Sequence, residues 1–109
     1  MSRSSDRTAP PPSDQVDRIL AVLHLLGPGE VVTYGDIAAD AGYPKHSRLV
    51  GRLLATTDAD VPWWRVVNSA GRLVPGHEHD QASLLGAEGV EVRDGKVRRA
   101  PHGRFARPS

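Results

Sequence analysis

The sequence predicts an α+β fold, namely a single winged helix-turn-helix domain with small β-hairpins and disordered termini. Two short helical segments follow each other across a tight connection that contains Gly42 and Pro44, which is the layout of a helix-turn-helix motif. Further along, Asp94-Gly95 separates two short extended segments, and this dipeptide is the strongest local signal for a β-hairpin. A chain of 109 residues supports one modest core, so both motifs are expected in one domain.

The N-terminal part divides into a polar segment and a first helix. Residues 1–12 are rich in Ser, Arg and Pro, so we expect them to be disordered or extended. The folded domain is predicted over residues 13–98. Ser13 is the expected N-cap of a helix that begins near Asp14, and Gly27-Pro28-Gly29 is expected to end it. The apolar residues of this helix recur at three- and four-residue spacing and are Val16, Ile19, Leu20, Leu23 and Leu26.

The helix-turn-helix follows a short extended segment at residues 31–33. Thr33 can cap the second helix, which Gly42 ends, and the third helix is expected over about residues 45–56. One side of the third helix carries Leu49, Val50, Leu53 and Leu54. The other side carries Arg48, Gly51, Arg52 and Ala55. Two cations beside two small side chains would let the helix backbone approach a partner closely, but a simple solvent-facing side is an equal alternative.

The segment from Val61 to Asn68 contains both tryptophans of the chain. Pro62 keeps the residue before it extended. The pattern fits two interpretations of Trp63 and Trp64. They either anchor the core beneath the valines that follow, or form the wall of a pocket for a flat partner such as a nucleobase.

The C-terminal half is predicted to contain short strands around one helix. The expected elements are a hairpin of residues 65–67 and 72–74 around a turn at 68–71, a helix from His79 or Asp80 to Gly89, and a hairpin of residues 90–93 and 96–98. Residues 99–109 form a basic, Pro-containing tail, and we do not expect this tail to fold.

Composition and charge exclude several function classes. Residues 1–92 hold 8 Lys and Arg against 12 Asp and Glu, whereas residues 93–109 hold 6 against 1, so a basic tail adjoins an acidic body. The chain has no cysteine, which excludes disulfides and thiolate chemistry. It has no apolar run of bilayer length and no hydrophobic signal core, so we expect a cytoplasmic protein without membrane contact.

The sequence gives little support for a metal site or for a catalytic nucleophile. His77, Glu78 and His79 cluster, but neighbouring residues in a loop do not make a tetrahedral metal site. There is no Gly-x-Ser-x-Gly elbow and no phosphate-binding or dinucleotide-binding fingerprint. We therefore expect no metal, no cofactor and no catalytic residue.

Three segments, taken together and in order, resemble the DNA-binding domain of the O6-alkylguanine-DNA alkyltransferase family. They are residues 29–38, 45–51 and 62–68, and the resemblance runs from about Val16 to Val92. The family carries Pro-Cys-His-Arg-Val where this chain has Pro62-Trp63-Trp64-Arg65-Val66. A tryptophan in the cysteine position is typical of the alkyltransferase-like proteins, which bind alkylated guanine in DNA without repairing it. The resemblance implies non-enzymatic lesion binding by minor-groove docking and nucleotide flipping.

The resemblance also assigns roles to residues. The tyrosine that helps to rotate the nucleotide out of the duplex corresponds to Tyr34, and the arginine that fills the vacated space corresponds to Arg48. A guanidinium plane suits the latter role because it can stack between bases. The DNA-binding and flipping set is Thr33, Tyr34, Arg48, Gly51, Arg52 and Ala55. The implied alkylguanine pocket is Tyr34, Pro62, Trp63, Trp64, Arg65, Val67, Asn68 and Ser69.

Around this pocket the chain departs from the enzymes. Trp64 stands where the enzymes have their activating histidine. Glu88 matches the glutamate that orients that histidine, so a structural role at a helix end is the better interpretation here. Arg65 is expected to organise the site through hydrogen bonds to the backbone. Some relatives that only bind use a basic residue in the following loop, and either Arg72 or His77 could take its place.

The resemblance implies duplex DNA that contains O6-alkylguanine as the partner, with nucleotide excision repair proteins acting on the complex, and we expect a monomer. Two other functions stay open on the sequence. A sequence-specific winged-helix transcriptional regulator would place the same helix in the major groove, although Gly51 and Ala55 are poor readers of base edges. A base-excising enzyme would use Glu88 or Asp60 to position water.

Overall fold

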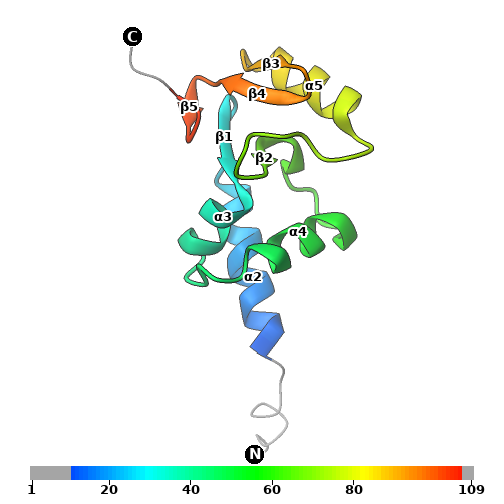
Figure 1. The fold of residues 1–109 in the computed structure, drawn as a ribbon. Helices are drawn as coiled ribbons and strands as arrows, with labels where there is room; N and C mark the ends of the chain where they lie inside the picture. Colours follow the sequence, from blue (N-terminus) through cyan, green and yellow to red (C-terminus); the bar gives the residue numbers. More distant parts are fainter. Residues whose placement is uncertain (1–10, 107–109) are drawn as a thin grey trace, which may run out of the picture.

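The computed structural model describes residues 11–106, and Figure 1 shows them as four helices with short strands between and beyond them. Helices α2, α3 and α4 lie in the lower half of this view, and α5 lies in the upper half with β3 and β4. The elements in order are α2 (Pro11–His24), β1 (Glu30–Thr33), α3 (Tyr34–Asp40), α4 (Ser47–Thr56), the 3-10 turn η1 (Trp63–Arg65), β2 (Val66–Val67), α5 (Glu78–Ala87), β3 (Glu91–Arg93), β4 (Lys96–Arg99) and β5 (His102–Gly103).

Helix α2 buries its predicted apolar stripe against the helix-turn-helix. Ile19 and Leu23 of α2, and Leu26 just after its end, belong to a first core cluster with residues of α3 and α4. The helix begins at Pro11, earlier than predicted, so the expectation of an extended segment up to residue 12 and of an N-cap at Ser13 is wrong. Proline is tolerated in the first helical turn because the amide hydrogen that it lacks has no partner there. The rest of the expected disordered segment, residues 1–10, lies outside the described residues.

Thr33 caps the start of helix α3, as predicted. The Thr33 hydroxyl accepts a hydrogen bond from the Asp36 amide at 3.1 Å, and the Asp36 carboxylate accepts one from the Thr33 amide at 3.0 Å. This reciprocal pair is a capping box, and it ties up two amides at the helix start. Gly42 adopts a φ of 94° directly after the helix, which turns the chain toward α4. The sequence therefore specified this connection well, although α4 begins at Ser47 rather than near residue 45.

The buried strand β1 is the centre of a three-stranded sheet. It pairs in parallel with β2 on one side, with Val32 opposite Val66, and with β5 on the other side. The predicted hairpin between residues 65–67 and 72–74 is thus wrong, since Arg72 instead forms a bridge to Lys96. The predicted turn at 68–71 is present, but it redirects the chain away from β2. Both neighbours of β1 come from distant parts of the sequence, which local patterns do not reveal.

The C-terminal tail is folded through residue 106, contrary to the sequence expectation. Strand β5 pairs with β1, Ala100 is buried, and Phe105 packs against a second core cluster. Gly103 adopts a φ of 86° and lies so close to the Val31 backbone that a Cβ atom would collide with it. The next residue, Arg104, donates from Nε to the Asp36 carboxylate at 2.8 Å. The tail therefore joins the sheet to the start of α3.

The second core cluster lies under the β3–β4 hairpin and α5. Its buried members are Val31, Val67, Leu73, Leu85, Val90, Val97 and Ala100. The hairpin is confirmed, with φ of 57° at Asp94 and 72° at Gly95, as a type I′ turn requires. The helix after the loop begins at Glu78, slightly before the predicted start. None of the helices within residues 11–106 has the length and apolar content that a membrane span needs.

Candidate nucleic-acid interface

A pocket of about 370 Å³ opens between the helix-turn-helix and the loop that precedes α5. This volume falls within the range of about 300–1,000 Å³ that small-molecule sites occupy. The residues that line the pocket are Tyr34, Gly51, Leu54, Ala55, Trp63, Val74 and His77. The pocket thus combines the first residue of α3, one side of α4, the 3-10 turn and the loop.

Trp63 forms the aromatic wall of this pocket. The backbone turns sharply after Pro62, because residues 63–65 form a single 3-10 turn. The Trp63 ring meets the ring of Trp64 edge to face at 6.2 Å and 89°, and it meets His77 at 5.8 Å and 66°. Edge-to-face contacts of this kind stabilise ring orientation. Trp63 is therefore held from two sides and remains available to the pocket.

Trp64 does not line the pocket; it is partly buried and packs against the second core cluster. Its indole Nε1 donates to Glu88 Oε2 at 3.0 Å, and its carbonyl accepts from the buried Gln81 side chain at 3.1 Å. The guanidinium of Arg65 lies 5.1 Å from the Trp64 ring centroid, within cation-π range. The expectation that Trp64 lines the pocket is corrected by this placement. Trp63 therefore fits the interpretation as a pocket wall, and Trp64 fits the interpretation as a core anchor.

Arg65 and Glu88 form a largely buried ion pair that joins distant segments. Arg65 Nη2 lies 2.6 Å from Glu88 Oε2, and Arg65 Nη1 donates to the Leu26 carbonyl at 2.8 Å. The Gly29 amide donates to Glu88 Oε1 at 2.8 Å. Burial acts to raise the pKa of Glu88, but the hydrogen bonds from Arg65, Gly29 and Trp64 outweigh it and lower this pKa to about 2. The structural role predicted for Glu88 and the backbone contact predicted for Arg65 are both present.

Tyr34 and α4 form the opposite wall. A Cβ atom at Gly51 would lie 3.9 Å from the Tyr34 ring, so the helix backbone approaches the tyrosine closely. Burial raises the pKa of Tyr34, which keeps its hydroxyl neutral and able to donate a hydrogen bond. Arg48 and Arg52 are exposed on α4. Thr33 is buried, and its hydroxyl caps α3 instead of facing a partner.

Five further residues of the predicted pocket do not line it: Pro62, Arg65, Val67, Asn68 and Ser69. Val67 is fully buried in the second core, and the Asn68 side chain accepts from the amides of Ala70 and Arg72. The side chains of Val67 and Asn68 are thus engaged within the protein, and the expectation that backbone groups of Val67, Asn68 and Ser69 read the guanine edge stays a prediction. Conversely, the sequence analysis missed Leu54 and Val74, and it left His77 as one of two options.

Comparison with known families identifies the DNA-binding domain of 6-O-methylguanine DNA methyltransferase over residues 14–90. A Vibrio parahaemolyticus protein named DNA base-flipping protein is 44% identical over 85 residues, which cover 73% of this chain and 85% of that protein. The Schizosaccharomyces pombe alkyltransferase-like protein 1 is 39% identical over 70 residues, which cover 59% of this chain and 65% of that protein.

Comparison with solved structures gives the same family. The crystal structure of S. pombe Atl1 in complex with damaged DNA containing O6-carboxymethylguanine matches with a TM-score of 0.69 and 30% identity, covering 78% of this chain and 87% of that one. The O6-methylguanine methyltransferase of Mycobacterium tuberculosis matches with a TM-score of 0.60 and 30% identity, covering 67% of this chain but only 47% of that one. The predicted α+β fold class is thus confirmed. The chain belongs to the family of the 6-O-methylguanine DNA methyltransferase DNA-binding domain.

Proposed function

We propose that this protein binds duplex DNA and holds an O6-alkylguanine base, rotated out of the helix, in the pocket walled by Trp63. The observation that carries the proposal is the pocket of about 370 Å³ in which an aromatic ring faces the helix-turn-helix. A flat base can stack on an indole, and such stacking contributes about 1–3 kcal/mol. The name of the Vibrio relative and the lesion in the S. pombe complex support this choice of ligand.

The proposed docking surface is the side of α4 that lines the pocket. Gly51 and Ala55 are small, so the minor groove of a duplex can approach the helix backbone there. In this proposal Tyr34, the first residue of α3, holds the rotated nucleotide, and Arg48, exposed on α4, fills the vacated stack. Rotating a base costs a few kcal/mol, and the cost is smaller for a base with weakened pairing. A preference for alkylated guanine follows from this difference.

Binding without alkyl transfer follows from the side chains in the nucleophile positions. The chain contains no cysteine, and Trp63 occupies the position of the family's acceptor sulfur. Trp64 occupies the position of the activating histidine. An indole N–H only donates, so Trp64 cannot remove a proton from a nucleophile. Its N–H is in any case engaged by Glu88.

We assign the basic loop residue at the pocket to His77. His77 lines the pocket and contacts the Trp63 ring, whereas Arg72 lies on the bridge to Lys96. The alkyl group of a base stacked on Trp63 would extend toward this loop.

The cellular proposal has three parts. The protein acts as a monomer in the cytoplasm, associated with the nucleoid when it binds DNA. The held complex marks the lesion, and the nucleotide excision repair machinery then removes it. This chain supplies recognition and leaves the chemistry to those partners.

A gel-shift titration with two duplexes of identical sequence, one carrying O6-methylguanine and the other guanine, tests the proposal. We expect tighter binding to the alkylated duplex and no loss of the methyl group after long incubation. Equal affinity for both duplexes would contradict it. A footprint confined to one undamaged sequence would favour a sequence-specific regulator, and release of free base would show an excising enzyme.

A further inference from the structure

Three cations are neighbours on one side of the C-terminal hairpin. Arg93 of β3 lies opposite Lys96 of β4, and Arg72 forms an antiparallel bridge to the same lysine. Directly opposed residues of an antiparallel pair present their side chains on the same face, with Cβ atoms about 4.5–5.5 Å apart. Val92 and Val97, the next opposed pair, turn to the other face and pack in the second core.

Arg98 extends this group, because its Nε donates to the Arg93 carbonyl at 3.2 Å. We call Arg72, Arg93, Lys96 and Arg98 the cation face. Two carboxylates lie beside it, at 3.4 Å between Glu91 and Arg93 and at 3.8 Å between Asp94 and Arg98. Four cations against two carboxylates leave a net charge of +2 on this surface.

Packing within the protein does not account for this arrangement. Like charges in directly opposed positions of a sheet are destabilising. The pair of Arg93 and Glu91 is largely exposed, with 65% and 53% of the side chains accessible, and in the second pair 33% of Arg98 and 82% of Asp94 are accessible. Exposed pairs contribute at most about 1 kcal/mol. An external polyanion would relieve the repulsion between the opposed cations.

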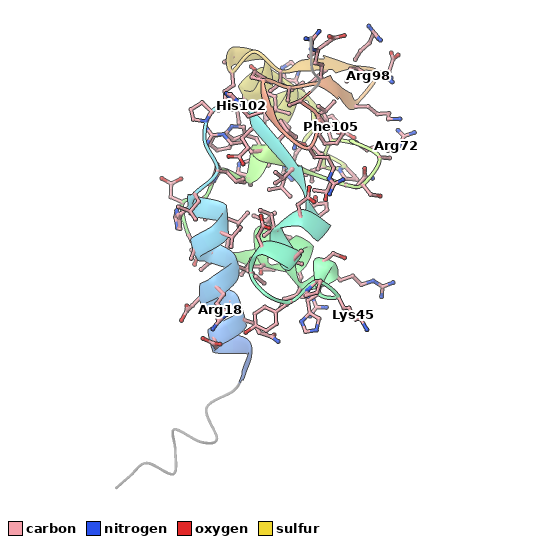
Figure 2. The ribbon with its side chains drawn as sticks, turned by 90° about the vertical axis from the view of Figure 1, so that its left-hand side faces the viewer. Arg18, Lys45, Arg72, Arg98, His102 and Phe105 are labelled. Atoms are coloured by element: carbon pink, nitrogen blue, oxygen red, sulfur yellow. The ribbon has the colours of Figure 1, made fainter. Side chains whose placement is uncertain are left out.

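Part of the cation face lies along the same side of the molecule as the turn of the helix-turn-helix. Figure 2 shows Arg72 and Arg98 along the same side as Lys45, which lies in the turn between α3 and α4. A duplex that follows this side would pass from the helix-turn-helix to the hairpin. An acidic protein would match the charge equally well, but it would not account for the alignment with the turn of the helix-turn-helix.

We infer that the cation face binds the phosphate backbone of the duplex arm beside the lesion. The inference rests on the proposed function, because it concerns the same DNA. Lys and Arg contacts to phosphates add affinity and fix the orientation of the protein without reading sequence. The contact therefore holds the protein in register on the duplex while the pocket selects the base.

The test is the salt dependence of binding by Arg72→Gln/Lys96→Gln, measured on guanine and O6-methylguanine duplexes. Each lost phosphate contact should lower the slope of log K against log salt by about 0.9, so the double variant should lose about 1.8. Affinity should fall by the same factor for both duplexes. Arg18→Gln is the control, since Arg18 is an exposed arginine of α2 that Figure 2 shows away from the hairpin arginines. It should keep the parent slope.

A second arm uses duplexes with the lesion near one end or the other. With the lesion near one of the two ends, the duplex lacks the arm that would contact the cation face. On that duplex the double variant should bind like the parent. A parent-like slope on every duplex would overturn the inference, provided that urea unfolding shows both proteins folded. Loss of slope without any lesion preference in the parent would instead refute the proposed function and leave this contact standing.

Discussion

The indole N–H of Trp64 donates a 3.0 Å hydrogen bond to the Glu88 carboxylate, which Arg65 and the Gly29 amide also contact. This bond keeps Trp64 in the core, and Trp63, at right angles to it, faces the pocket. Glu88 thus positions the pocket wall from a distance, through a residue that does not line the pocket. The same carboxylate joins α5, η1 and the turn before β1.

Glu88→Ala should destabilise the protein by about 3–5 kcal/mol, because it leaves the largely buried Arg65 without its partner. Urea unfolding measures the difference. Glu91→Ala is the matched control, since Glu91 also pairs with an arginine but is 53% exposed, and it should cost at most about 1 kcal/mol. Equal losses in both variants would show that the Glu88 network does not stabilise the fold.

The free energy of unfolding of the protein should fall at acidic pH. The pKa of Glu88 is lowered from 4.5 to about 2, and the hydrogen bond from Arg104 is the main cause that lowers the pKa of Asp36 from 3.8 to about 2. Carboxyls with depressed folded-state pKa values contribute stability above their unfolded pKa and lose it as the pH falls through the folded value. The free energy of unfolding should therefore drop between about pH 4.5 and 2.

Urea titrations at a series of pH values measure this drop. Glu88→Gln should flatten the pH dependence while it lowers the plateau above pH 5, because the charge that protonation removes is already absent. A parent protein with constant stability down to pH 2 would contradict the shifts of both carboxyls.

Variants in the proposed pocket and in the docking helix should have different effects on DNA binding. Trp63→Ala removes the wall, so it should reduce the preference for O6-methylguanine over guanine by about tenfold, in line with the loss of one stacking contact. Arg48→Ala should weaken binding to both duplexes, since its contact forms with any rotated base. Gel-shift titrations of both variants on both duplexes give the four affinities. Parent-like affinities throughout would refute the pocket assignment.

Gly103→Ala should break the pairing of β5 with β1. An alanine would be strained at a φ of 86°, by about 1–2 kcal/mol, and its Cβ would collide with the Val31 backbone. Gly86→Ala is the control, because Gly86 lies inside α5 with open space around it, and the change should stabilise the protein by about 0.5–1 kcal/mol. Thermal unfolding of the two variants should shift in opposite directions.

Restoring the family pair tests the account of the missing chemistry. Trp63→Cys alone should not accept a methyl group from O6-methylguanine, because no base activates the thiol. Trp63→Cys with Trp64→His places a histidine within the network of Glu88 and is the variant in which transfer is expected. Mass spectrometry of the protein after incubation with the lesion duplex detects the transferred methyl. Transfer by the single variant would disprove the need for the histidine.

The sequence alone determined the features that depend on neighbouring residues. The cap of α3 at Thr33, the end of that helix at Gly42 and the Asp94-Gly95 hairpin each follow from local backbone geometry, and all three are present. The order of three family segments likewise sufficed to identify the fold, because a resemblance needs no knowledge of contacts.

Only the tertiary structure decided which strands pair and which tryptophan faces the pocket. Parallel pairing joins β1 to strands far away in the chain, and no short pattern records it. Trp63 and Trp64 are adjacent and carry the same indole ring, so their local sequence pattern does not show which of them faces the pocket. A single distant carboxylate, Glu88, makes the difference, because the hydrogen bond that it accepts holds one indole in the core and leaves the other to the pocket.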